Sequence, residues 1–152
     1  MVNWYKTAQA KIDKTLVVYD FDDTIAHGTS DLQRILNIGE DKPYVWINDF
    51  LRDYSKYGND LYIMTARMQK TMGGCKKKIR EFLKQFGIDF PESNIICSGF
   101  LPSTAVCKDR EFRKILDEKD VSRIIFIDDD ESNRGAIRNL CIDYPEVDFV
   151  VV

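Results

Sequence analysis

Short apolar runs alternate with helical patterns along this chain of 152 residues. Five of the runs have the Val, Ile and Tyr content that is typical of buried parallel strands. They are Thr15–Tyr19, Asp60–Met64, Asn94–Cys97, Arg123–Ile127 and Asp148–Val152. Apolar residues recur at three- and four-residue spacing in the intervening segments Val45–Lys56, Gly74–Phe86, Asp109–Glu118 and Ser132–Asn139. Because repeated strand–helix units form parallel sheets with right-handed crossovers, we predict an α/β fold. We expect a doubly wound, Rossmann-like sheet of about five strands with helices on both faces.

The composition fits a single domain over residues 1–152, since 44% apolar residues are enough for a hydrophobic core. No apolar stretch approaches the ~20 residues of a membrane helix, and Met1–Gln9 lacks the apolar centre of a signal peptide. The four cysteines are scattered without the spacing of a zinc site. We therefore expect a cytoplasmic protein with reduced thiols and no membrane partner.

Polar residues follow each of the first four predicted strands. The strands are followed in turn by Asp20-Phe21-Asp22, Thr65-Ala66-Arg67, Ser98-Gly99 and Asp128-Asp129-Asp130, and Lys108 lies where a loop gives way to the third helix. Doubly wound sheets bind ligands at the carboxyl ends of their strands. We therefore expect these side chains to converge on one edge of the sheet.

Asp20 and Asp22 have the spacing of two side chains that point the same way from a strand. Two carboxylates facing one pocket suit a divalent cation and a nucleophile paired with an acid/base group. The alternative is a helix N-cap after the strand, formed by Asp22, Asp23 or Thr24.

In order and spacing these motifs resemble those of the haloacid dehalogenase superfamily of phosphohydrolases over nearly the whole chain. That family has an apolar strand ending in DxDx(T/V), a second ending in Thr or Ser, a lysine, and an acidic pair after a fourth strand. The corresponding residues here are Asp20-Phe21-Asp22-Asp23-Thr24, Thr65, Lys108 and Asp128-Asp129. With Thr-Ala-Arg and the double Asp, the layout is similar to the phosphatase halves of polynucleotide kinase–phosphatases and to small phage-type phosphatases. No kinase P-loop is present in this chain.

The resemblance implies a phosphatase that works through an aspartyl-phosphate. Asp20 would be the nucleophile, and Asp22 would protonate the leaving oxygen and then activate water. Mg²⁺ would be held by the Asp20 carboxylate, the Asp22 main-chain carbonyl and the Asp129 carboxylate, with Asp128 reaching it through water.

The resemblance also implies that Thr65, Ala66, Arg67 and Lys108 bind the substrate phosphate, and that Thr65 and Lys108 act in catalysis. Three of them have a simpler interpretation: Thr65 as a helix cap, Arg67 as an exposed arginine and Lys108 as part of a solvated helix face. Lys114 competes with Lys108, which we prefer because it lies at a helix start.

Residues around the acidic triplet have simpler interpretations too. Asp130 and Glu131 suit the first turn of a helix, and Asn133 stands where many relatives carry another acid.

The resemblance implies that the substrate is a nucleotide or a polynucleotide 3′-phosphate end. No segment is long enough for a cap domain, so we expect an open pocket, which would admit polymer ends or phosphoproteins. About twenty residues between Thr24 and Val45 are enough for a flap, Ala26–Pro43. The run Lys76-Lys77-Lys78, with Arg80 and Lys84, could follow a nucleic-acid backbone or simply form the solvated face of a helix.

Two other functions fit parts of the pattern. Asp20–His27 is similar to the DLDETLVH signature of phosphatases that act on the carboxy-terminal domain of RNA polymerase II, which would make the substrate a phosphoprotein. Receiver modules of response regulators also place acids, Thr or Ser, and Lys at strand ends, but in a different order.

Overall fold

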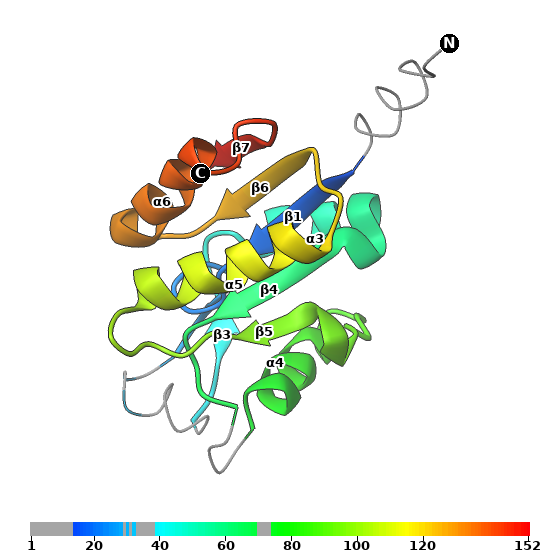
Figure 1. Ribbon diagram of the computed structural model, residues 1–152. Helices are drawn as coiled ribbons and strands as arrows, with labels where there is room; N and C mark the ends of the chain where they lie inside the picture. The colour runs from blue at the N-terminus through cyan, green and yellow to red at the C-terminus, as the bar shows by residue number, and fades with distance from the viewer. Residues whose placement is uncertain (1–13, 29, 31, 33–38, 70–73) are drawn as a thin grey trace.

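A five-stranded parallel sheet forms the centre of the computed structural model, which describes residues 14–28, 30, 32, 39–69 and 74–152 (Figure 1). Its strands lie in the order β5-β4-β1-β6-β7, and all four neighbouring pairs are parallel. Their bounds are β1 Thr15–Tyr19, β4 Leu61–Thr65, β5 Ile95–Cys97, β6 Arg123–Ile127 and β7 Asp148–Val151. These are the five predicted strands, with ends that differ by one residue at most.

Helices cover both faces of the sheet, so the doubly wound arrangement is confirmed. The helices are α3 (Ile47–Tyr57), α4 (Cys75–Lys84), α5 (Thr104–Glu118) and α6 (Glu131–Arg138). Short 3₁₀ turns occupy Gly58–Asp60, Glu92–Asn94 and Asn139–Ile142. Phe50 of α3 and Phe82 of α4 belong to one buried cluster, and Phe112 of α5 and Ile137 of α6 belong to the other.

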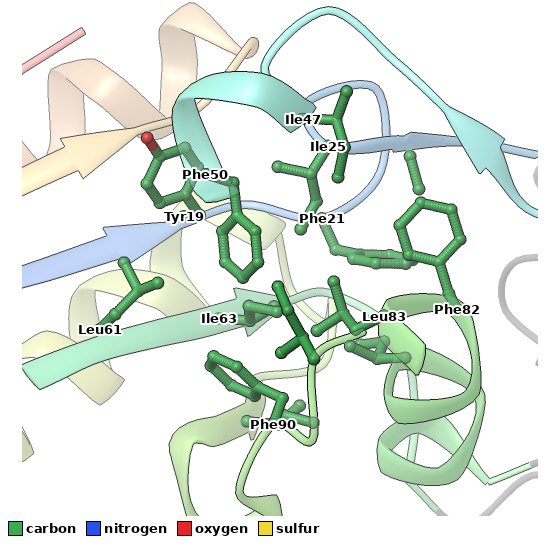
Figure 2. Close-up of a cluster of buried hydrophobic side chains, with 14 of the residues drawn as sticks. Tyr19, Phe21, Ile25, Ile47, Phe50, Leu61, Ile63, Phe82, Leu83 and Phe90 are labelled. Atoms are coloured by element: carbon green, nitrogen blue, oxygen red, sulfur yellow. The ribbon is translucent and has the colours of Figure 1, made fainter. Parts of the chain in front are cut away.

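Strand β1 is buried on both faces because its side chains alternate between the two clusters. Val17 and Tyr19 lie in the cluster under α3 and α4, whereas Leu16 and Val18 lie in the cluster under α5 and α6. Phe21 continues the first series and meets Phe82 edge to face, with ring centroids 5.4 Å apart. Both side chains are labelled in Figure 2. Burial of Phe21 therefore anchors the segment that carries the two aspartates beside it.

The third helix begins earlier than we predicted. Its predicted range was Asp109–Glu118, but α5 begins at Thr104, where the Ser103 side chain accepts a hydrogen bond from the Val106 N–H. This N-cap stabilises a first turn that lacks a clear apolar stripe. The prediction that Lys108 lies at a helix start is therefore wrong, because Lys108 is in the second turn.

A short hairpin forms the base of the predicted flap. Strands β2 (Ala26–His27) and β3 (Lys42–Pro43) pair antiparallel, while residues 29, 31 and 33–38 of the flap lie outside the described part of the chain. Between Thr65 and Lys108, the described residues contain α4, one 3₁₀ turn, β5 and the start of α5, with no additional domain. Over the described ranges, no helix is long and apolar enough to cross a membrane.

Candidate active site

Asp20 and the aspartates after β6 meet at the point in the sheet where the order of the strands reverses. From β1 the chain proceeds to β4 on one side, and it later returns to β6 on the other, so the crevice between β1 and β6 is the topological switch point. Tyr19 is paired with Ile127, and the Asp20 N–H donates to the Ile127 carbonyl at 2.8 Å. The ends of the two strands are thus fixed against each other.

Lys108 reaches this crevice from α5 and is completely buried. Its Nζ donates to Asp20 Oδ1 at 2.7 Å and to Asp128 Oδ2 at 2.8 Å. Burial alone would lower the pKa of Lys108, but the two carboxylates raise it above its usual value, so the side chain remains a cation. Lys114, its competitor in the sequence, is exposed and pairs with Glu111 instead. The structure therefore places Lys108, and not Lys114, beside Asp20.

Three aspartates provide more negative charge here than Lys108 can neutralise. Carboxylate oxygens of Asp20, Asp128 and Asp129 lie within 4.8 Å of one another. The Thr24 hydroxyl lies 3.1 Å from Asp20 Oδ2 and 3.3 Å from Asp129 Oδ1. Burial raises the pKa of Asp20 well above its usual range, Lys108 opposes that shift, and Asp128 adds to it. Burial also raises the pKa of Asp129. Additional positive charge would stabilise this cluster.

Asn133 supplies a further oxygen to the same place. The residue is only 4% exposed, and its Nδ2 donates to Asp128 Oδ2 at 3.0 Å. That contact fixes the orientation of the amide and leaves Oδ1 buried with no hydrogen-bond partner among the described residues. Asn133 bonds to Asp128 and lines the same cleft as Asp20 and Asp129, so its orphaned oxygen fits a site for a hard divalent cation and its bound water. The residues present therefore fit Mg²⁺.

Asp130 and Glu131 have structural roles, as their simpler interpretation predicted. Asp130 is the N-cap of α6, and its Oδ1 accepts from the N–H groups of Ser132 at 2.8 Å and Asn133 at 3.4 Å. Glu131 lies in the first helical turn and pairs with Arg134 and Arg138. Asp130 also lines the cleft.

Asp22 is held by a buried arginine. Arg67 donates to both oxygens of Asp22, from Nε at 3.0 Å and from Nη2 at 2.7 Å, and the Arg67 residue is only 3% exposed. The interpretation of Arg67 as an exposed arginine is therefore wrong. The helix N-cap interpretation of Asp22, Asp23 and Thr24 is also wrong, because this segment turns directly into β2.

Thr65 ends β4 with its side chain fully buried. Its Oγ1 accepts from the Arg67 N–H at 3.2 Å, so the hydroxyl caps a turn and not a helix. Ser98, at the end of β5, donates to the Thr65 carbonyl from its N–H at 2.8 Å and from its hydroxyl at 3.1 Å. These bonds hold the loop with Ala66 and Arg67 beside Asp20 and Asp22.

An open cleft of about 460 Å³ lies over these groups. It is lined by Asp20, Asp22, Asp23, Ala66, Arg67, Phe100, Thr104, Asp129, Asp130 and Asn133. Sequence reasoning missed Phe100 and Thr104. Both residues follow the third predicted strand, and this position could have identified them, because loops at that edge of the sheet form the binding crevice. Thr65 and Lys108 do not line the cleft, and Lys108 lies buried next to Asp20.

Comparisons with protein-family models, curated proteins and solved structures found no match to this chain. What the site does must therefore be inferred from its geometry and chemistry.

Replacing Asp20 by Asn should raise the melting temperature of the metal-free protein at neutral pH. Because the pKa of Asp20 is raised in the folded protein, Asp20 stabilises the fold below pH 3.8, its ordinary pKa. This stabilisation is lost as the pH rises through the folded-state pKa. The increase in melting temperature caused by Asp20→Asn should therefore become smaller toward pH 4. Added Mg²⁺ should also make this increase smaller, because it would stabilise the wild type.

Thermal unfolding with EDTA or Mg²⁺ measures both effects. Asp148→Asn, which removes an exposed partner of Arg123, is the matched control and should show neither. A lower melting temperature for Asp20→Asn at pH 7 without metal would contradict the proposed charge imbalance.

Proposed function

We propose that this protein is a Mg²⁺-dependent phosphatase that hydrolyses phosphomonoesters through an aspartyl-phosphate on Asp20. The observation that carries the proposal is the buried contact of Lys108 with Asp20 and Asp128, in a crevice that also holds Asp129. Burying a lysine between two carboxylates and beside a third costs stability, because the charges lose their hydration. Such clusters are typical of functional sites.

Asp20 and Asp129, together with the Asp22 main-chain carbonyl, would hold the metal, and Asp128 and Asn133 would contact its water. A bound Mg²⁺ would supply the positive charge that offsets repulsion between the Asp20 carboxylate and the phosphate.

The reaction has two steps. In the first, an Asp20 oxygen attacks phosphorus, the bond to the leaving oxygen breaks, and Asp22 donates its proton to that oxygen. In the second, Asp22 accepts a proton from water as the water oxygen attacks phosphorus, which releases phosphate and restores the Asp20 carboxylate. Lys108 keeps its charge beside Asp20 in both steps and stabilises the negative charge that builds on the transferred group.

The topology argues against a receiver module. Counting only the parallel strands along the chain, their order in the sheet is 3-2-1-4-5, whereas receiver modules of the CheY type have the order 2-1-3-4-5. Catalytic turnover of a phosphomonoester would separate the two functions directly, because a receiver keeps its phosphoryl group.

Nucleotides and polynucleotide 3′-phosphate ends are the proposed substrates. The cleft is open, and Phe100 in its lining offers a ring on which a base could stack. Lys76 and Lys77, with Arg80 and Lys84, line a hollow of about 210 Å³ along α4. The Lys76 N–H donates to Gln69, two residues after Arg67, so this hollow begins near the cleft.

Phosphopeptides of the RNA polymerase II type are the rival substrates, and the structure gives them less support. His27, the last residue of the similar signature, bonds to Asp23 at 2.6 Å and stacks on Tyr44 at the base of the flap.

Asp20→Asn should abolish hydrolysis of p-nitrophenyl phosphate in the presence of Mg²⁺, because the nucleophile is lost while the shape is kept. Asp22→Asn should lower turnover of this substrate on the order of 10²–10⁴-fold, because Asp22 no longer takes the proton from the attacking water in the second step. Steady-state release of p-nitrophenolate measures both, with Asp148→Asn as the control. Wild-type turnover by Asp20→Asn would exclude the aspartyl-phosphate mechanism.

Activity should disappear with EDTA and return with Mg²⁺, whereas Ca²⁺ should inhibit because its looser coordination would let Asp20 bind it through both oxygens. Asp129→Asn should raise the Mg²⁺ concentration needed for half-maximal activity. Asp130→Asn is the matched control, because Asn preserves the N-cap and Asp130 is not assigned to the metal. Full activity in EDTA, or equal shifts for the two variants, would count against this metal site.

Changing Lys76, Lys77 and Lys78 together to Glu should weaken turnover of 3′-phosphorylated oligonucleotides but not of p-nitrophenyl phosphate. Oligonucleotide turnover by the wild type should also fall with added salt, because phosphate contacts release counterions. Changing Lys56 and Lys114, which lie on other helices, to Glu provides the control. Unchanged oligonucleotide turnover would assign the three lysines to a solvated face, and faster turnover of phosphopeptides would favour the rival substrate.

A further inference from the structure

Arg67 joins the proposed acid/base Asp22 to a second carboxylate, Asp41, at the base of the flap. Arg67 Nη2 donates to Asp41 Oδ1 at 2.8 Å, and Nη1 donates to Asp41 Oδ2 at 3.3 Å. The side chain of Arg67 is only 2% exposed and that of Asp41 only 11%. The Arg67 guanidinium also lies 5.0 Å from the Phe21 ring, which packs beneath it. One buried cation thus connects three segments that are far apart in the sequence.

The donors of Arg67 are almost fully committed to these two carboxylates. A guanidinium has five N–H groups, and the contacts with Asp22 and Asp41 use four, from Nε, Nη1 and both hydrogens of Nη2. Binding a substrate phosphate would require the buried Arg67 to release one of these two carboxylates, which is costly. Its geometry therefore suits the positioning of Asp22 better than direct contact with phosphate.

The hairpin of the flap explains why Asp41 lies beside Arg67. Asp41 directly precedes β3, and Pro43 of β3 is paired with Ala26 of β2. Ala26 in turn forms a bridge with Asp22. The same short hairpin therefore fixes the backbone of Asp22 directly and its carboxylate through Asp41 and Arg67.

We propose that Asp41 is a positioning residue for Asp22, acting through Arg67, so that the base of the flap sets the orientation of the group that transfers the proton. Without Asp41, the guanidinium keeps one carboxylate partner, Asp22, in place of two and is free to tilt. Asp22 would then face the leaving oxygen less accurately. This inference rests on the proposed function of Asp22.

The test compares two substrates that differ in their need for a proton. The p-nitrophenolate group leaves without protonation, whereas the alkoxide of β-glycerol phosphate needs a proton from Asp22. The value of kcat/KM covers the steps up to release of the alcohol, so it isolates this transfer from the later attack of water. For Asp41→Asn we expect kcat/KM to fall on the order of 10- to 100-fold for β-glycerol phosphate and less than about 3-fold for p-nitrophenyl phosphate. The change should lie mainly in kcat.

Three comparisons make the outcome decisive. Asp22→Asn should show the same selective loss in stronger form, and Asp148→Asn, at a surface ion pair distant from the cleft, should show none. Asp41→Glu keeps the charge but lengthens the side chain, so its ratio of alkyl to aryl kcat/KM should lie between those of the wild type and Asp41→Asn. If Asp41→Asn does not fold, the ratio for Asp41→Glu decides alone. A wild-type ratio, or equal losses on both substrates, would overturn the role of Asp41. Absence of any hydrolysis by the wild type with Mg²⁺ would instead overturn the proposed function.

Discussion

The contact of Lys108 with Asp20 and Asp128 is the interaction on which the arrangement of the site depends. It joins α5 to the ends of β1 and β6, and all three side chains are less than 10% exposed. Desolvation makes such a buried network a weak source of stability, since burial of each charge offsets much of the attraction. Burial raises the pKa of Asp20, and the charge of Asp128 adds to that rise although Lys108 opposes it. The fold thus holds a cluster whose excess negative charge a bound cation would offset.

The parallel sheet makes this concentration of charge possible. Each strand reaches the same edge at its carboxyl end, so residues 20, 65, 98 and 128 come together although the chain between them is long. Phe21 packs into the core between the two aspartates of the first strand end and provides a rigid support. The aspartates of the proposed site therefore follow directly on the ends of buried strands, where the backbone has little freedom to move.

Two cations in the crevice have different partners and, as we propose, different tasks. Lys108 lies on the side of Asp20 and the metal cluster, whereas Arg67 lies on the side of Asp22 and the flap. Both are buried and both are paired with two aspartates. This division keeps the proposed nucleophile and the proposed acid/base in separate electrostatic surroundings, which is how one pocket can assign different roles to similar carboxylates.

The sequence alone determined the five strands of the sheet, the residues at their ends and, within the described part of the chain, helices α3 to α6 apart from the first turn of α5. Alternating apolar patterns and short polar strand ends are local signals. It also selected Lys108 over Lys114, although the reason given, a helix start, was wrong. Only the tertiary structure decided three other features: the burial of Arg67, the orphaned oxygen of Asn133 and the pairing of Asp41 with Arg67. Each depends on contacts between residues distant along the chain, and burial converts an ordinary surface residue type into a paired, oriented group. Local periodicity contains no information about which distant carboxylate will meet a given arginine.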